Sequence, residues 1–224
     1  MALGMPRSTR IDFPGAINHV MVRGVAGRTL YEDDNDRYVF LSQAARQFDG
    51  VQSFCLVWAL MLNHGHLLPR TGELSLSSAM QRLNSGYATY FNRRHDRQGH
   101  LFQNRFKSLL VDGESYLFRV IRYVLLNPVR AGVVDGLETL ERYPWTSYPE
   151  LLGHRGKKLG EPELVLRLFA DDVRAARREL RSWLELGLKE EDPIAKLIER
   201  GPGRPSKGKS IDEIAARIHA RDAT

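Results

Sequence analysis

Apolar residues recur along this chain with two different spacings, and the change of spacing separates predicted strands from predicted helices. Stretches that are continuously apolar, or apolar at every second position, predict strands at 17–25, 51–61, 64–68 and 106–111. Stretches with apolar residues three and four positions apart predict helices at 33–48, 76–94 and 114–127. Pro69 is expected to end its strand or to place it at a sheet edge, while Asp112 and Pro128 are expected to bound the last helix.

The predicted order is therefore strand, helix, strand, strand, helix, strand, helix. The first six elements follow the βαββαβ order of a ferredoxin-like unit. We expect an α+β domain at residues 1–155, built on a ferredoxin-like βαββαβ antiparallel sheet with helices on one face. A helical C-terminal extension is expected at 156–200, followed at 201–224 by a basic linker and a short terminal helix.

Two histidines mark the strand predicted at 64–68. His64 and His66 are two positions apart, and side chains at that spacing point to the same face of a strand. Two neighbouring imidazoles can bind one divalent metal ion when a third group completes the site. Two histidines at this spacing also occur in strands with no metal, so the pattern needs support from elsewhere in the chain.

The helix predicted at 114–127 carries the second group of polar residues. Arg119, Tyr123 and Asn127 lie four apart, so they form one row beside the apolar face of that helix. A guanidinium, a phenol and a carboxamide then point in the same direction. The helix pattern alone also allows a plainer interpretation, with Tyr123 at the rim of an amphipathic helix and Asn127 as its C-terminal cap.

Together the two stretches resemble a known family. His64-Gly65-His66 and Tyr123-Val-Leu-Leu-Asn127-Pro128-Val-Arg-Ala-Gly132 resemble the HUH single-tyrosine transposases with an IS200-like transposase domain, and among them the REP-associated tyrosine transposases. The resemblance covers about residues 6–155. Three further parts of the chain carry it: the first strand at 19–24, the middle segment at 90–94 and 99–106, and the closing block at 143–148.

The sequence departs from the family at two positions beside the motif. A bulky apolar residue is usual at Gly65, and Pro is usual at Leu62. Because Gly weakens a strand interior, this departure is expected to loosen the backbone that holds the two histidines. The alternative is that neighbours such as Trp58 have grown into the space behind Gly65.

The resemblance implies a metal-dependent transposase that cleaves and rejoins single-stranded DNA through a 5′-phosphotyrosine intermediate. It implies Tyr123 as the nucleophile and His64 and His66 as metal ligands, with Asn127, one turn beyond Tyr123, as the third ligand. The cofactor implied is Mg²⁺ or Mn²⁺. Two imidazoles favour Mn²⁺ over Mg²⁺, and the ligand types leave Zn²⁺ open. The DNA partner implied is single-stranded DNA with hairpins.

Charge and local composition agree with a nucleic-acid partner. The chain has a net charge of +6 and a pI of about 9.6. Basic and aromatic residues interleave between 90 and 107, a pattern that suits phosphates and unstacked bases, although a solvated helix end followed by core aromatics has the same composition. His19 and His100 are further candidates for contacts to DNA or to a metal ligand. The residues predicted to contact DNA are Arg23, Arg94, Arg97, Arg105, Lys107 and Arg119.

Composition also limits the class of protein. The single Cys55 permits no disulfide framework within the chain, and no apolar run approaches the roughly 18 residues needed to span a bilayer. With no signal-peptide pattern, we expect a cytoplasmic monomer or homodimer without a membrane partner. Two rival functions remain: a DNA-binding regulator of the same fold that has lost catalysis, and an unrelated metallohydrolase that would need further His or carboxylate ligands.

Overall fold

The computed structural model describes residues 13–50, 52–154, 159–190 and 194, so the linker and terminal helix predicted at 201–224 lie outside the described residues. The strands are β1 (Asn18–Arg23), β2 (Phe54–Met61), β3 (His64–Arg70) and β4 (Lys107–Leu110). The helices are α1 (Asp34–Phe48), α2 (Leu76–Arg94), α3 (Glu114–Arg130), α4 (Leu137–Leu140), α5 (Tyr148–Leu151), α6 (Pro162–Leu166) and α7 (Val173–Leu188), with a 3₁₀ turn, η1, at Val25–Gly27.

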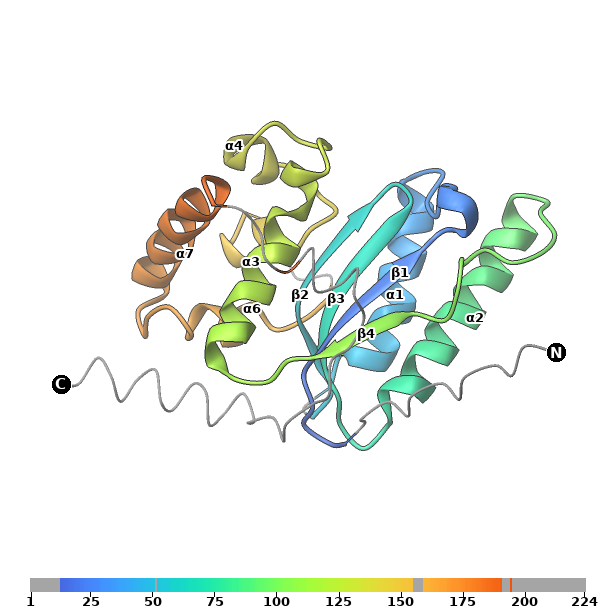
Figure 1. The fold of residues 1–224 in the computed structure, drawn as a ribbon, viewed down its shortest axis with the longest axis horizontal. Coiled ribbons are helices and arrows are strands. Elements are labelled where there is room, and N and C mark those ends of the chain that lie inside the picture. The colour runs from blue at the N-terminus through green and yellow to red at the C-terminus, as the bar shows by residue number, and fades with distance from the viewer. Residues whose placement is uncertain (1–12, 51, 155–158, 191–193, 195–224) are drawn as a thin grey trace, which may run out of the picture.

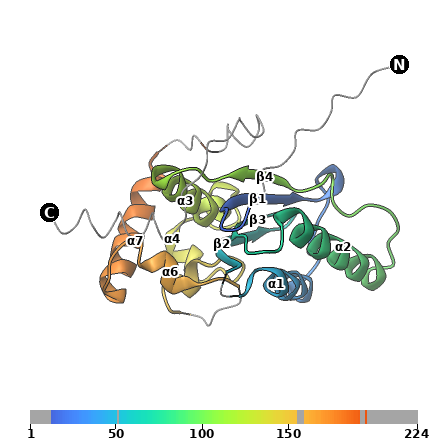
Figure 2. The ribbon, with the colours of Figure 1, turned by 90° about the horizontal axis from the view of Figure 1, so that it is seen from below.

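The four strands form one sheet in the order β2-β3-β1-β4, with every neighbouring pair antiparallel. This order is that of a ferredoxin-like unit, so the predicted fold class is confirmed. Helices α1 and α2 lie together on one side of the sheet, and α3 lies on the other with α6 and α7 (Figures 1 and 2). The two histidines of β3 are on an interior strand, on the face that α3 covers.

Each face of the sheet has its own apolar core, because side chains alternate along the strands. Val20 and Val22 of β1 pack with residues of α1 and α2, whereas Leu56 and Met61 of β2 pack with residues of α3. Cys55 is fully buried on the α1–α2 side, as a small apolar residue would be. The site histidines therefore lie above a sheet that is packed on both faces.

The closing block of the domain covers the outer edge of β2. The amide of Leu60 donates to the carbonyl of Trp145 at 2.7 Å, and the amide of Ser147 donates to the carbonyl of Trp58 at 3.0 Å. These bonds pair backbone groups that an edge strand would otherwise expose. They also explain why all eight residues of β2 are buried.

The prediction that α3 ends before Pro128 is wrong, since the helix continues to Arg130 with the proline inside it. The amide of Ala131 donates to the carbonyl of Asn127 at 2.8 Å, and that of Val133 donates to the carbonyl of Pro128 at 2.9 Å. These bonds, and the burial of Pro128, hold the last turn although the proline ring supplies no N–H. Asn127 is consequently inside the helix rather than at its C-terminal cap.

Two other predicted boundaries also differ from the structure. The residue that precedes the first turn of α3 is Gly113, with φ of 93°, and not Asp112, so no side chain caps this helix. Strand β3 runs on through Pro69, which lies opposite Cys55 on β2 in the interior of the sheet. The register between β2 and β3 shifts between Cys55 and Trp58, and an irregular ladder of this kind accommodates a proline that cannot donate.

Of the two helices described in the C-terminal extension, α7 packs on α3, and α6 packs on β2 and α7. Leu166 and Leu168 are buried in the same core as α3, together with Leu180 and Leu184 of α7. Arg130 of α3 donates to the carbonyl of Gly187 at 3.1 Å. The helix that carries Tyr123 is thus held between the sheet and α7, and the domain boundary at 155 stays a prediction.

Candidate functional site

The two histidines of β3 project together toward α3. His66 lies opposite Met21 of β1 and Ala59 of β2, and His64 lies opposite Arg23. The centroids of the two imidazole rings are 5.4 Å apart, with the ring planes at 90°. His66 is 1% exposed, whereas His64 is only partly buried. One ring is therefore enclosed by protein and the other borders solvent.

Helix α3 brings a phenol and a carboxamide to this pair. The ring of Tyr123 meets the ring of His66 edge to face, with centroids 5.2 Å apart, and Tyr123 is 8% exposed. One turn later, Oδ1 of Asn127 lies 3.3 Å from Nε2 of His64. The spacing of four residues on a helix thus matches the spacing of two residues on the strand beneath it. Arg119, one turn earlier, is exposed and donates to the carbonyl of Ser115.

His64 has an oxygen acceptor next to each ring nitrogen. Its Nδ1 is 2.7 Å from Oδ1 of Asn63, and its Nε2 faces Asn127. Burial lowers the pKa of His64, the hydrogen bond to Asn127 opposes this, and the nearby charge of Arg23 lowers it further. A neutral imidazole has one proton to give to two oxygens. With that proton on Nδ1, the lone pair of Nε2 and an oxygen of Asn127 converge, which is an arrangement that suits a cation.

His19 of β1 also lies in this site, and the sequence pattern did not indicate which residues it would contact. Its Nε2 lies 2.9 Å from Nδ1 of His66, the two rings are stacked with centroids 5.1 Å apart, and its ring also meets Tyr123 at 5.4 Å. Burial lowers the pKa of His19 to about 4 and lowers that of His66 well below 6.5. Both rings are therefore neutral at pH 7. Three imidazoles, a phenol and a carboxamide converge here from β1, β3 and α3.

Comparison with known proteins identifies the domain that holds this cluster. Residues 19–126 match the model of the family described as transposase, IS200-like. The chain carries an IS200-like transposase domain. A solved structure of a REP-associated tyrosine transposase bound to a REP hairpin has the same fold, with a TM-score of 0.56 and 15% identity over 75% of this chain and 93% of that one. No curated protein matches the chain.

Two of the predicted DNA-contacting residues lie on the same face of the sheet as the histidines. Lys107 of β4 is opposite Met21, which is opposite His66, so these three residues form one row across the sheet. Residues directly opposite each other share a face. Lys107 and Arg23 are both exposed, and two strand spacings place Lys107 about 10 Å from His66.

The segment that leads into β4 runs beside β1 at this end of the sheet. The amide of Gln103 donates to the carbonyl of Arg23, and the amide of Val25 donates to the carbonyl of Leu101, both at 2.9 Å. Arg105 follows in this segment and is exposed, as is His100 before it. These backbone bonds therefore place part of the basic and aromatic stretch at 90–107 next to β1, the strand that carries Arg23.

The remaining basic candidates have partners within the protein. Arg94 donates to Asp33 through both Nη atoms, at 2.7 and 2.5 Å, and to the fully buried Asp36 at 2.5 Å. The guanidinium of Arg97 lies 5.6 Å from the ring centroid of Phe91. Phe91 and Phe106 are themselves buried in the core, so the interleaved rings at these two positions are core aromatics rather than exposed stacking surfaces.

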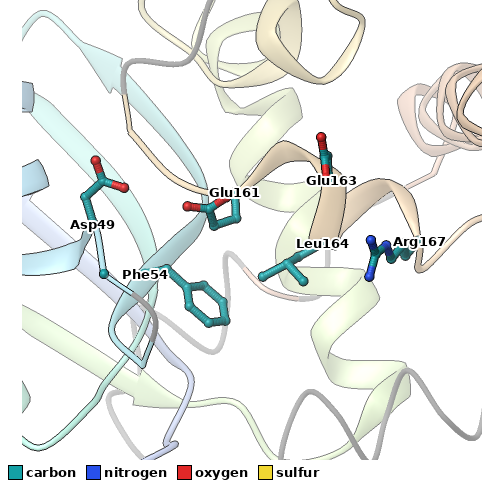
Figure 3. Close-up of a pocket in the computed structure, with 7 residues that line it drawn as sticks. Asp49, Phe54, Glu161, Glu163, Leu164 and Arg167 are labelled. Carbon is teal, nitrogen blue, oxygen red and sulfur yellow. The ribbon is translucent and has the colours of Figure 1, made fainter.

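A separate cavity of about 470 Å³ lies at the other end of the β2–β3 ladder (Figure 3). Its lining includes Asp49 and Phe54 on one side and Glu161, Leu164 and Arg167 on the other. Phe54 pairs with Arg70 at the end of the ladder remote from His64. The cavity contains none of the residues of the converging cluster.

Within the described part of the chain, no group of three or more His, Cys, Asp and Glu side chains is arranged to hold a metal ion. The carboxamide of Asn127 is a polar group of another type, and its oxygen lies 3.3 Å from Nε2 of His64. Among the same residues, no helix is both long and apolar enough to cross a membrane.

Proposed function

We propose that this IS200-like transposase domain cleaves and rejoins single-stranded DNA, with Tyr123 as the nucleophile. The observation that carries the proposal is the position of Tyr123: its ring packs against His66 while Asn127, on the next turn of the same helix, reaches His64. A helix that presents a nucleophile and a polar ligand to a pair of histidines suits phosphoryl transfer, in which positioning and charge stabilisation supply most of the catalysis.

The proposed reaction exchanges one phosphodiester bond for another. The phenol oxygen of Tyr123 bonds to the scissile phosphorus, and the bond between that phosphorus and the 3′ oxygen breaks. The phenol gives up its proton and the departing oxygen takes one up to become a free 3′ hydroxyl, while the 5′ phosphate stays on the enzyme. Attack of a 3′ hydroxyl on the phosphotyrosine reverses these steps, so rejoining needs no nucleotide cofactor.

The donor set of the site fits a divalent metal ion. His64 and His66 would hold it through their Nε2 atoms and Asn127 through its carboxamide oxygen, and both imidazoles are neutral at pH 7, as metal binding requires. When bound, Mg²⁺ or Mn²⁺ withdraws charge from the phosphate oxygens. Two nitrogen ligands favour Mn²⁺ in affinity.

We propose that the single-stranded DNA runs over the face of β1 and β4 beside the histidines. Arg23 and Lys107 lie on that face, Arg105 lies in the adjoining segment, and Arg119 is exposed on α3 one turn before Tyr123. The solved relative with this fold is bound to a REP hairpin, which supports a hairpin with flanking single strand as the DNA. Arg94 and Arg97 are less suited to phosphates because their guanidinium groups already have partners.

The test is incubation of the protein with single-stranded hairpin DNA and Mn²⁺, followed by a denaturing gel for a covalent protein–DNA adduct. The native chain should form the adduct and Tyr123→Phe should not, although it should still bind the hairpin because only a hydroxyl is lost. Tyr116→Phe is the matched control on the same helix and should form the adduct normally. Hairpin binding without any adduct in the native chain would instead support the regulator that has lost catalysis.

A further inference from the structure

In both histidines of β3, the ring nitrogen Nδ1 lies within hydrogen-bond distance of another polar side chain. Nδ1 of His64 is 2.7 Å from Oδ1 of Asn63, and Nδ1 of His66 is 2.9 Å from Nε2 of His19. Each histidine therefore has a polar partner at Nδ1, and these partners come from different places: the β2–β3 hairpin and strand β1. Neither partner belongs to the set proposed to hold the metal.

The hydrogen bonds of Asn63 determine which atom of His64 carries the proton. The side-chain amide of Asn63 donates through Nδ2 to the carbonyl of Gly27 at 3.2 Å, so its oxygen is the end that faces His64. An oxygen can only accept, and the oxygen of Asn63 is nearer to its ring nitrogen than that of Asn127, at 2.7 Å against 3.3 Å, so we infer that Nδ1 of His64 is the donor. In a neutral ring this leaves the lone pair on Nε2, the nitrogen that faces Asn127.

The contact between His19 and His66 can likewise leave Nε2 of His66 without a proton. One proton lies between the two nitrogens; if it belongs to His66, Nε2 of His66 is left unprotonated. His19 is 2% exposed and its ring is stacked on His66, so it can fix the orientation of that ring as well as its proton. Metal-binding histidines commonly donate their other N–H to a fixed acceptor, which orients the ring and makes it a stronger ligand.

We propose that Asn63 and His19 are positioning residues, which hold His64 and His66 in the tautomer with the proton on Nδ1 and the Nε2 lone pair turned toward the site. This inference rests on the proposed function, because it gives the two histidines a metal to bind. His19 has a second contact, with the ring of Tyr123, so it also links the metal-binding strand to the nucleophile.

The tautomers can be measured without metal or DNA, by nitrogen NMR of histidine-labelled native protein at about pH 8, where imidazoles are neutral. Both His64 and His66 should show the proton on Nδ1. Replacing His19 by Phe keeps a ring against Tyr123 and removes the acceptor, so His66 should shift toward the form with the proton on Nε2. Asn63→Leu should do the same to His64 alone. A native protein with the proton of His66 on Nε2 would overturn the proposal for His19, and the same finding at His64 would overturn it for Asn63.

Calorimetry with Mn²⁺ gives the second readout. His19→Phe and Asn63→Leu should each weaken Mn²⁺ binding by about tenfold or more, and His19→Gln, which restores an acceptor oxygen, should recover part of it. His154→Gln is the matched control at an exposed histidine and should bind Mn²⁺ as the native protein does. Unchanged affinity in both acceptor-free variants would contradict the proposal. Because the NMR result is independent of cleavage, absence of a DNA adduct would refute the proposed function and leave the tautomer assignment to stand or fall separately.

Discussion

At the scale of single residues, the space behind Gly65 explains how the histidine pair is supported without the bulky residue that its family usually carries there. A Cβ atom added at Gly65 would lie 3.0 Å from Cδ2 of Leu60, 3.1 Å from the hydroxyl of Tyr31 and 3.5 Å from Cγ2 of Val22. The space is therefore already filled, by Leu60 and Tyr31 rather than by the Trp58 that the sequence suggested. The structure favours a supported backbone over a loosened one.

Gly65→Val should consequently destabilise the protein. Val adds three carbons where even a Cβ is crowded, and overpacking of a core costs about 1–3 kcal/mol. Thermal melting should show a lower midpoint, and cleavage of hairpin DNA should be slower because the histidine backbone has shifted. A higher melting temperature with faster cleavage would mean that the site has room and that the glycine loosens it.

The hydroxyl of Tyr31 offers a way to separate crowding from other effects. It is buried and makes no hydrogen bond to a described residue, so Tyr31→Phe removes, at little cost, the oxygen that a Cβ at Gly65 would approach to 3.1 Å. Gly65→Ala should therefore be less destabilising in a Tyr31→Phe background than in the native chain. Equal losses in the two backgrounds, measured by denaturant unfolding, would show that Tyr31 does not limit the space.

The proposed metal ligands are also tested at single residues. His64→Ala and His66→Ala should each weaken Mn²⁺ binding strongly and abolish metal-dependent cleavage, because the remaining ligands hold a hydrated cation poorly. Calorimetry measures the affinity and the adduct gel measures the cleavage. His154→Ala, at an exposed histidine, is the control. Native Mn²⁺ affinity in both ligand variants would place the metal elsewhere.

At the scale of elements, the contact between α1 and α2 is fixed by a buried carboxylate. Asp36 of α1 is fully buried and accepts hydrogen bonds from Arg94 of α2 and from the amide of Glu32, with His95 at 2.9 Å. Arg94 also pairs with Asp33, which caps the N-terminus of α1. These bonds join the end of α2 to the start of α1, so they account for Arg94 without a DNA contact.

Arg94→Ala should therefore lower stability and leave the salt dependence of DNA binding unchanged. The variant loses charge-assisted hydrogen bonds to Asp33 and Asp36, while solvent screening at the partly exposed Arg94 and the remaining donors of Asp36 limit the loss of stability. The bond to Arg94 lowers the pKa of Asp33, so its contribution is present above the unfolded pKa of about 3.9 and fades as pH falls below it. The stability difference between native and variant should thus shrink only in acid. If the variant kept native stability but reduced the slope of log DNA affinity against log salt, Arg94 would instead contact DNA.

The elements themselves were predictable to different degrees. The apolar spacing of α2 predicts its bounds, Leu76–Arg94, because local periodicity and the Ser75 cap define it. The end of α3 was not predictable, because the turn after Pro128 is held by burial and by bonds to later residues. The place of His19 in the site and that of Tyr31 behind Gly65 also depend on strand pairing and side-chain packing between distant parts of the chain. The relative position of Tyr123 and Asn127 was predictable from the sequence, because both residues lie on one helix, four positions apart.

At the scale of the whole molecule, the sheet exposes a basic strip beside the site while α3 covers the rest of that face. Arg23 and Lys107 lie on this strip. Neutralising either residue should weaken binding to all single-stranded sequences alike, and the slope of log affinity against log salt should shrink by roughly 0.7 for each phosphate that the variant no longer neutralises. Thermal stability should not change, in contrast to Arg94→Ala. A fixed slope with altered sequence preference would show that these side chains read bases.

In the proposed reaction, Tyr123 forms the covalent bond to DNA. The most direct measurement is mass spectrometry of the protein after reaction with hairpin DNA and Mn²⁺, nuclease trimming and proteolysis. We expect a nucleotide attached through its 5′ phosphate to the peptide that contains Tyr123. A nucleotide on Tyr116 or on another residue, or hairpin binding with no modified peptide, would contradict it.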